Sequence, residues 1–236
     1  METTRKIIKI HHNGIGDSLQ FSTLPFMFHL KGYQVWISDQ SPFKSRDIFD
    51  LIWGCNRYIT GISSEPANCG EIPENKYDNP CDSFIQNWEK INGLEPLNHT
   101  PIIYYKPKEI PELKDVILID ISCSSRKNDY DFNLIYEYIS NEYFSSKVLS
   151  ITFTYFEYEK HFDLPEIKCD SIFHYCDMIY SCKKFVCLNS GGHSLASAIK
   201  RFKDIDVDCL VTHTPTFDSM YAKKNFFYPN INYVWL

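Results

Sequence analysis

Long apolar runs are absent from this sequence of 236 residues. No stretch approaches the roughly 20 consecutive apolar residues that cross a bilayer, and the polar, basic residues 1–6 are not followed by the apolar segment of a signal peptide. An excess of basic residues is absent too, since the formal net charge is −6. That charge gives no general electrostatic footprint for nucleic acid. We therefore expect a cytoplasmic protein with no transmembrane segment and no nucleic-acid partner.

A compact disulfide framework is also missing. The nine cysteines are an odd number and come without a secretory signal, so reduced thiols in a cytosolic protein are the favoured interpretation. The four cysteines between residues 169 and 187 are too loosely spaced for a zinc ribbon and include no C-x-x-C pair: Cys169, Cys176, Cys182 and Cys187. Neither a P-loop nor a G-x-S-x-G nucleophile elbow occurs, and there is no solenoid-type repeat.

What the sequence contains is a repeated order of buried strand, polar turn and helix. Hydrophobic residues make up 44% of the chain and aromatic residues 16%, enough for a substantial core in one large or two small domains. Before residue 106 the patterns predict strands at 7–10, 33–37 and 102–105, helices at 46–53 and 84–91, and a long irregular region at 54–82. After residue 114 they predict strands at 116–121, 148–153, 185–188 and 209–212, and helices at 132–143, 171–180 and 195–201.

The segment from Lys106 to Lys114 separates these two halves. It holds two prolines among charged residues, which disfavours a continuous helix or a central strand. Because the strand–turn–helix order restarts after it, we predict two domains, residues 1–108 and residues 109–236. Strands that alternate with helices on both sides of a linker are typical of two α/β layers with parallel sheets. The predicted fold class is therefore α/β.

The stretch from Lys6 to Asp39 organises the first half. A β-branched strand at 7–10 leads into a glycine turn at 13–18, and a second strand follows at 33–37. Between them, one helix ending near Gly32 is predicted from apolar and small residues at helical spacing: Leu19, Thr23, Met27 and Leu30. This order is a βαβ unit.

The glycine turn of that unit is the first candidate site. We expect its glycines, Gly14 and Gly16, to adopt backbone angles closed to other residues. The turn presents amide donors at a helix N-terminus and places one carboxylate, that of Asp17, beside them. A dinucleotide fingerprint would need a third glycine where Leu19 stands, so an NAD-type site is disfavoured.

Two further polar segments could hold phosphate. The glycine turn at 189–194 joins a predicted strand to a predicted helix, and such a junction presents amides to an anion and permits close approach. The alternative is a tight turn with an N-cap from Ser190 or Ser194. In the loop at 122–127, Arg126 suits bidentate phosphate contact and Lys127 a point-charge contact. The alternative there is a plain solvated loop.

Together these motifs resemble the heptosyltransferase-like glycosyltransferases of glycosyltransferase family 9. Residues 16–19 (Gly-Asp-Ser-Leu) and 23–25 (Thr-Leu-Pro) are similar to the turn and Leu-Pro pair that open the acceptor-side domain of that family. Residues 188–196 are similar to its C-terminal motif, where a strand ends in Asp-Ser/Thr-Gly before a His-Leu-Ala helix start. The sequence departs from that motif in two ways. Asn189 stands where the family commonly has Asp, and Ser194 takes the usual His position because His193 falls one place early.

The resemblance implies both a fold and a set of binding residues. The implied fold is a compact version of the GT-B type, in which two Rossmann-like domains face each other across a cleft. The N-terminal domain would receive the acceptor beside a turn that includes His12, Asn13, Gly14 and Gly16. The C-terminal domain would bind a nucleotide-diphosphate sugar through the residues of the loop and the second turn: Ser124, Ser125, Arg126, Lys127, Asn189, Ser190, Gly191, Gly192, His193 and Ser194.

The implied activity is inverting transfer of a sugar, such as a heptose, to a hydroxyl acceptor on a surface glycan, a lipopolysaccharide-type saccharide or a protein. Asp17 would remove the acceptor proton. His11 and His12 are weaker candidates, because adjacent residues at a strand end face opposite ways. No cofactor and no metal is required if basic side chains and helix-end amides neutralise the leaving diphosphate, although some relatives carry a cysteine-bound metal. Peripheral membrane contact and oligomer formation are compatible with this interpretation.

Two alternatives come from other functional classes. A nucleotide-sugar- or glycan-binding module could keep the fold without turnover, and the missing charge at Asn189 favours that interpretation. Another phosphate-handling α/β enzyme is the second alternative, because glycine turns and basic loops serve many phosphates. The binding module would bind a nucleotide sugar without releasing nucleotide, whereas the other enzyme would bind nucleotide without any dependence on the sugar.

Overall fold

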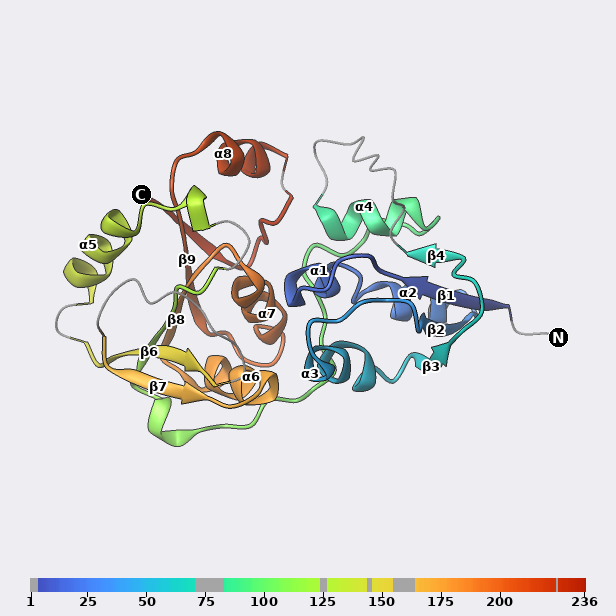
Figure 1. The fold of residues 1–236 in the computed structure, drawn as a ribbon, viewed down its shortest axis with the longest axis horizontal. Helices are drawn as coiled ribbons and strands as arrows, with labels where there is room; N and C mark the ends of the chain where they lie inside the picture. The colour runs from blue at the N-terminus through green and yellow to red at the C-terminus, as the bar shows by residue number, and fades with distance from the viewer. Residues whose placement is uncertain (1–3, 71–82, 124–126, 144–145, 155–163, 224) are drawn as a thin grey trace. The chain divides into compact units, whose positions relative to one another are not determined.

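The computed structural model describes residues 4–70, 83–123, 127–143, 146–154, 164–223 and 225–236 (Figure 1). The chain forms two compact units. The first unit comprises Met1–Lys106 together with Ala222–Tyr228, and the second comprises Pro107–Tyr221 together with Pro229–Leu236. Each unit is built on its own parallel sheet, with four described strands in one and six in the other. This confirms the predicted α/β class with parallel sheets.

The first unit places its strands in the order β3-β2-β1-β4, and every described strand pair is parallel. Strand β1 pairs with β2 through Ile7 and Ile8, which are almost completely buried. In chain order the elements are β1 (Arg5–Lys9), α1 (Ile15–Gln20), α2 (Leu24–Leu30), β2 (Gln34–Ser38), α3 (Arg46–Phe49), a π-helical turn (Asp50–Gly54), β3 (Ile59–Ser63), β4 (Cys69–Gly70) and α4 (Phe84–Ile91).

The single helix predicted after the first glycine turn is wrong, because the structure has two. Helix α1 ends at Gln20, and α2 begins at Leu24 with Pro25 in its first turn. Proline has no N–H to donate and its ring clashes with the carbonyl four residues earlier, which here belongs to Phe21. Proline at the start of a new helix is well tolerated. Gly32 follows α2 with a φ of 82°, as a helix stop of this kind requires.

Two other predictions for the first unit are wrong. The sequence predicts an irregular region at 54–82, of which residues 71–82 lie outside the described part, yet residues 54–70 contain β3 and β4. Strand β4 has only two residues and β3 has a glycine, Gly61, at its centre, so neither gives a clear apolar pattern. The apolar run at 102–105 was expected to be a strand, yet no strand is found there. The backbone N–H of Ile102 instead donates to the Ser22 hydroxyl at 2.8 Å. Ile102 and Ile103 are buried in a connection without helix or strand.

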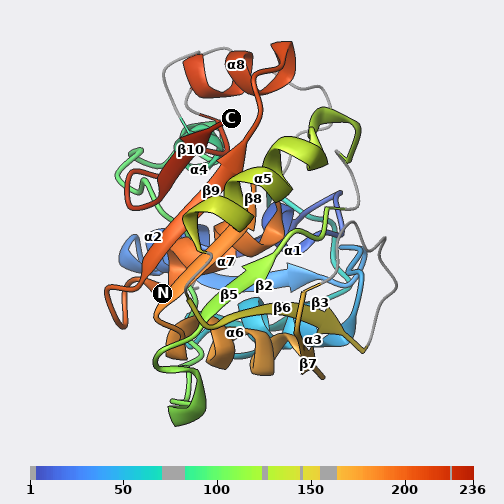
Figure 2. The same cartoon turned by 90° about the vertical axis from the view of Figure 1, so that its left-hand side faces the viewer.

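The second unit places its strands in the order β10-β9-β8-β5-β6-β7. Helix α5 lies on one face of this sheet, and α6 and α7 lie on the other (Figures 1 and 2). Its elements are a 3₁₀ turn (Pro111–Leu113), β5 (Ile117–Asp120), a second 3₁₀ turn (Lys127–Asp129), α5 (Phe132–Glu142), β6 (Val148–Phe153), β7 (Glu166–Cys169), α6 (Ile172–Ser181), β8 (Lys184–Leu188), α7 (Gly191–Ile199), β9 (Asp206–Val211), α8 (Pro215–Ala222) and β10 (Asn232–Trp235).

The core of the second unit follows from its apolar strands. The side chains of β8 from Phe185 to Leu188 are fully buried, as are most of those in β5 and β9. Such near-continuous apolar runs are typical of parallel strands that are covered on both faces. Each fully buried Leu, Ile or Phe side chain contributes about 1.5–3 kcal/mol. The sequence patterns missed β7, α8 and β10, and they placed the start of α7 too late, at Leu195.

Both sheets reverse their strand order next to their first strand. In the first unit the chain builds outward from β1 to β2 and β3, and then adds β4 on the other side of β1. In the second unit it builds outward from β5 to β6 and β7, and then adds β8 on the other side of β5. In open α/β sheets, ligands bind outside the carboxyl ends of the strands at such a switch point. None of the helices in the described part of the chain is both long and apolar enough to span a bilayer.

Candidate functional site

The first glycine turn lies at the switch point of the first sheet, between the carboxyl end of β1 and helix α1. Gly14 is the N-cap of α1 and has an extended backbone, so Asp17 is the third residue of the helix. The Asp17 carboxylate folds back over the turn, because a Cβ on Gly14 would lie only 2.6 Å from its Oδ2. Its side chain is half-buried. The structure therefore holds the carboxylate close to the strand-to-helix junction.

The predicted reason for the glycines of this turn is wrong. Among the described residues, glycines with positive φ are Gly32, Gly70 and Gly93, and neither Gly14 nor Gly16 is one of them. Gly14 has a φ of −73°, which any residue can adopt. What the position requires is space for the Asp17 carboxylate, because a side chain on Gly14 would collide with it.

Asp17 lines a small pocket within the first unit. The pocket has a volume of about 70 Å³ and combines three polar side chains with four aromatic ones: His12, Asp17, Gln20, Phe21, Phe84, Trp88 and Phe226. Of the two adjacent histidines, His12 is therefore the one that faces Asp17's pocket, whereas His11 is not among the lining residues. No sequence pattern indicated that Phe226, far along the chain, would join this site.

The second glycine turn lies at the switch point of the second sheet, between β8 and α7. Ser190 is the N-cap of α7 and accepts a hydrogen bond from Gly192 N at 3.4 Å. The side chains of His193 and Ser194 are buried, at 1% and 0% exposure, and His193 Nδ1 lies 2.5 Å from Ser190 O. A ligand at this turn would therefore meet the backbone of residues 191–194 rather than these two side chains. Residue Asn189, at the end of β8, is also buried.

The loop after β5 approaches the same junction. Three predicted donor-binding residues, Ser124, Ser125 and Arg126, lie outside the described residues, and Lys127 begins a 3₁₀ turn. Two hydrogen bonds fix the residues that follow. The Tyr130 hydroxyl donates to Asn189 O at 3.3 Å, and the Thr212 hydroxyl donates to Asp129 O at 2.5 Å. The structure thus brings the end of this loop together with the turn after β8.

Asp120 is a candidate residue that the sequence analysis missed. It ends β5 directly beside the switch point and is only 3% exposed. Its carboxylate accepts hydrogen bonds from the Ser122 amide at 2.9 Å, from the Ser122 hydroxyl at 2.6 Å and from the Tyr175 hydroxyl. Burial raises the pKa of Asp120, and these hydrogen bonds act against the rise. The signal available in the sequence was the one acidic residue, Asp120, within the otherwise apolar run at 116–121.

Gly192 packs directly against the Asp120–Tyr175 pair. A Cβ at this position would lie 2.9 Å from Asp120 Oδ2 and would collide with the Tyr175 hydroxyl. We expect Gly192→Ala to lower the free energy of unfolding by about 1–3 kcal/mol, as overpacking does in a tight core. Denaturant melts of Gly192→Ala, Tyr175→Phe and the double variant test this. The double variant should lose less than the sum of the two, because removing the hydroxyl removes the collision. Additive losses would contradict the packing explanation.

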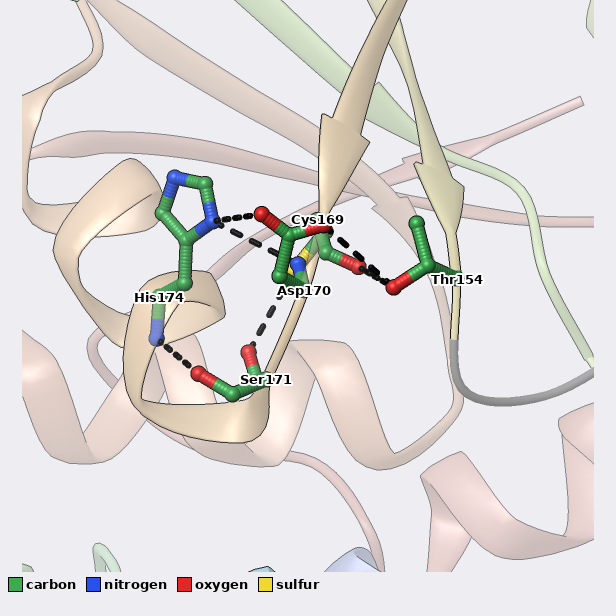
Figure 3. Close-up of polar contacts among 5 residues, drawn as sticks. All are labelled: Thr154, Cys169, Asp170, Ser171 and His174. Carbon is green, nitrogen blue, oxygen red and sulfur yellow. Dashed lines mark hydrogen bonds and ion pairs between the residues drawn. The ribbon is translucent and has the colours of Figure 1, made fainter.

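Away from the two glycine turns, a polar cluster lies at the carboxyl ends of β6 and β7 (Figure 3). Its members are Thr154, Cys169, Asp170, Ser171 and His174. The Thr154 hydroxyl donates to Cys169 O at 3.2 Å and to Asp170 Oδ1 at 3.3 Å. Ser171 caps α6 by accepting from His174 N at 3.1 Å, and His174 Nδ1 accepts from Asp170 N at 3.4 Å. These bonds tie the two strand ends to the start of α6. We therefore assign this cluster a structural role.

The cysteines do not form a metal site in the described part of the chain. Within it, no group of three or more His, Cys, Asp or Glu side chains could hold a metal ion. The four cysteines considered from the sequence, between residues 169 and 187, are all buried and form no disulfide. Burial raises the pKa of the Cys182 thiol to about 12, which is typical of an unreactive core cysteine.

Comparison with known proteins supports the fold. No family model and no curated protein matches the sequence. Among solved structures, the iron-containing dodecameric glycosyltransferase TibC from enterotoxigenic E. coli matches with a TM-score of 0.62 at 15% identity, over 88% of this chain and 58% of that chain. TibC in complex with ADP-D-beta-D-heptose matches with a TM-score of 0.62 at 14% identity, over 89% and 58%.

Two further structures match over more of their own length. A family 9 glycosyltransferase from Veillonella parvula has a TM-score of 0.64 at 7% identity, over 100% of this chain and 87% of that one. E. coli ADP-heptose lipopolysaccharide heptosyltransferase II has a TM-score of 0.60 at 8% identity, over 97% and 90%. The present chain spans somewhat over half the length of TibC. The predicted resemblance to family 9 and the GT-B type is therefore confirmed as a likeness of fold.

Proposed function

We propose that this protein is an inverting glycosyltransferase. It would move a sugar, such as a heptose, from a nucleotide-diphosphate sugar to a hydroxyl on a surface glycan, a lipopolysaccharide-type saccharide or a protein. One observation carries the proposal: in each parallel sheet, a glycine turn that resembles a family motif lies at the carboxyl end of a strand at the switch point. Such positions bind ligands in α/β folds generally. TibC, which shares the fold, binds ADP-heptose.

The donor would bind to the second unit. The first N–H groups of α7 lie at the strand-to-helix junction, and a helix N-terminus of this kind attracts phosphate oxygens, while the long 3.4 Å bond from Gly192 N to Ser190 Oγ would have to be shared or exchanged. Arg126 and Lys127 follow the neighbouring strand β5 and would supply positive charge. Amides and cations of this kind stabilise a leaving diphosphate as its charge develops.

The acceptor would bind to the first unit, at the pocket of Asp17. The carboxylate would take the proton of the acceptor hydroxyl as its oxygen bonds to the anomeric carbon. The bond from that carbon to the diphosphate oxygen would break in the same step, and the diphosphate would leave with the electron pair. Attack from the face opposite the leaving group inverts the anomeric centre. A positioned base of this kind contributes about 10²–10⁴-fold to the rate.

A thermal-shift panel of nucleotide-diphosphate sugars, followed by assays of nucleotide release, tests the proposal. A ligand at one hundred times its Kd adds about 2.7 kcal/mol to the free energy of unfolding. We expect stabilisation by one sugar nucleotide and release of its nucleotide only when an acceptor is present. Binding without release would favour the non-catalytic binding module. Nucleotide binding that ignores the sugar would favour another phosphate-handling enzyme.

Removing the basic residues of the loop should weaken donor binding. We expect Arg126→Ala or Lys127→Ala to cost roughly 1.5–3 kcal/mol, a factor of about 10–150 in Kd, because each removes a charge-assisted contact to phosphate. Gly191→Val should also weaken binding by blocking close approach of the backbone. Lys183→Ala, an exposed lysine at the amino end of β8, is the control. Calorimetry that gives the same donor Kd in all four variants would show that the phosphates bind elsewhere.

A further inference from the structure

The pocket beside Asp17 has a buried floor and a more accessible rim. Its floor is formed by Gln20, Phe21 and Trp88, which are 5%, 2% and 2% exposed. The Trp88 indole N–H donates to Gln20 Oε1 at 3.1 Å, and the Phe21 and Trp88 rings stack with their centroids 4.8 Å apart. These contacts fix the floor, because both the polar and the apolar atoms are already engaged.

The rim combines aromatic rings with an imidazole and a carboxylate. Phe84, at the start of α4, meets Phe226 edge to face with ring centroids 4.5 Å apart. Phe226 belongs to residues 222–228, which rejoin the first unit after the chain has built most of the second. Both rings are partly exposed, and His12 and Asp17 complete the rim. Aromatic rings and a carboxylate therefore line the same opening.

This combination suits one face of a pyranose ring. A pyranose presents apolar C–H groups on its faces and hydroxyl groups around its edge. Pockets that bind small polar molecules commonly pair aromatic surface with a few oriented polar groups, as here. A volume of about 70 Å³ cannot enclose a whole sugar. The pocket therefore fits part of a terminal residue, with the rest of a larger saccharide extending outward.

The charge of the pocket restricts the sugar further. Among the described residues that line it there is one carboxylate, Asp17, and neither a lysine nor an arginine. An acidic sugar would bring a second carboxylate towards Asp17 with no permanently charged lysine or arginine among these residues to offset it. Two like charges in a partly desolvated site disfavour binding. A neutral sugar has no such penalty.

We propose that this pocket is an acceptor subsite for a neutral pyranose, whose ring packs on Phe84 and Phe226 and whose hydroxyl points to Asp17. The inference rests on the proposed glycosyltransferase function and adds the class of acceptor. It also gives Phe226 a binding role in addition to packing.

The test is a titration of the protein with methyl glycosides of glucose, galactose and mannose, together with methyl glucuronide as an acidic counterpart of the glucoside. Saturation-transfer NMR and Trp88 fluorescence report binding, and Trp88→Phe identifies the fluorescence signal. We expect at least one neutral glycoside to bind and the glucuronide to bind at least tenfold more weakly than the glucoside. Phe226→Ala and Phe84→Ala should each raise the Kd of the bound glycoside about tenfold or more.

The control is Phe26→Ala, which removes a partly exposed ring that pairs with Tyr58 elsewhere in the first unit and does not line the pocket. This variant should leave glycoside binding unchanged. Melting temperatures and donor affinity, measured on all three phenylalanine variants, show whether they remain folded. The inference is overturned if no neutral glycoside binds, if the glucuronide binds as well as the glucoside, or if folded Phe226→Ala and Phe84→Ala proteins bind normally. Failure of the proposed function would be seen separately, as absence of sugar-nucleotide binding by the unaltered protein.

Discussion

Replacing Asp17 with asparagine is expected to reduce turnover by roughly 10²–10⁴-fold while leaving donor affinity and the melting temperature nearly normal. A hydroxyl is a poor nucleophile until its proton is being removed, and the asparagine amide cannot accept that proton. Asparagine is close to aspartate in size and also interacts well with the first turn of a helix, so the local structure should be retained. Initial rates of nucleotide release with a donor and an acceptor measure the effect.

The competing explanation is that Asp17 only stabilises the start of α1. Gly14 is the N-cap, and Asp17 is the third helical residue with its carboxylate folded back towards the cap. A helix-stabilising role predicts a lower melting temperature in Asp17→Ala and normal turnover in Asp17→Asn. Normal turnover in Asp17→Asn would remove Asp17 as the base. Attention would then pass to His12, which lines the same pocket.

The second large effect is expected at Lys184. Its ammonium group lies 2.7 Å from Asp208 Oδ2, and the side chain of Asp208 is only 4% exposed. The same carboxylate accepts from the Tyr143 hydroxyl at 2.8 Å and from Asn232 Nδ2 at 2.7 Å. The network thus ties β8, β9 and β10 to the end of α5. We expect Lys184→Met to lower the free energy of unfolding by about 3–5 kcal/mol, because it leaves a buried carboxylate without its cation.

The exposed partner of the same lysine supplies the control. Lys184 also lies 3.1 Å from Asp206, whose side chain is 61% exposed. Asp206→Asn should cost less than about 1 kcal/mol, as exposed ion pairs contribute little. Denaturant unfolding of both variants measures the difference. Equal losses in the two variants would show that burial of Asp208 does not control the effect.

The pH dependence of these variants follows from the pKa of Asp208. Burial alone would raise this pKa, but the hydrogen bonds from Lys184, Asn232 and Tyr143 outweigh burial and lower it. The network therefore contributes stability above the unfolded pKa of about 3.9, and this is lost as the pH falls through the lower folded pKa. The deficit of Lys184→Met should be largest near neutral pH. It should shrink in acid, where the buried carboxylate is protonated.

Most strands of the second unit could be predicted from the sequence, because a buried parallel strand is a short run of β-branched and apolar residues. Strand β6 lies where it was predicted, and β5 and β8 are within a residue or so. Strand β4 escaped because two residues are too few for a pattern to emerge, and β7 escaped because two of its four residues, Glu166 and Lys168, are charged. The run at 102–105 misled for the opposite reason: apolar residues bury equally well in a connection without strand pairing.

The candidate sites, too, were predicted from the sequence only in part. Local motifs were enough to find the two glycine turns, because the residue types that permit a sharp strand-to-helix junction are contiguous in the chain. They did not reveal why those glycines are needed. At Gly14 the reason is the close approach of the Asp17 carboxylate, and at Gly192 it is the close approach of the Tyr175 hydroxyl and the Asp120 carboxylate. For Gly192 the neighbours lie on β5 and α6, and their distance from it is set only by how the strands pair and the helices pack.

By itself, the sequence determined that this protein is an α/β chain with parallel strands, because hydrophobic periodicity and turn residues act over a few positions. It also determined the likeness to family 9, through two short motifs. Only the tertiary structure decided that β1 and β5 each lie at a switch point, that Asp120 lies beneath the second turn, and that Phe226 joins the pocket of Asp17. These relations join residues up to about two hundred positions apart in the numbering. Strand order and helix packing place such residues together, and no local pattern records either.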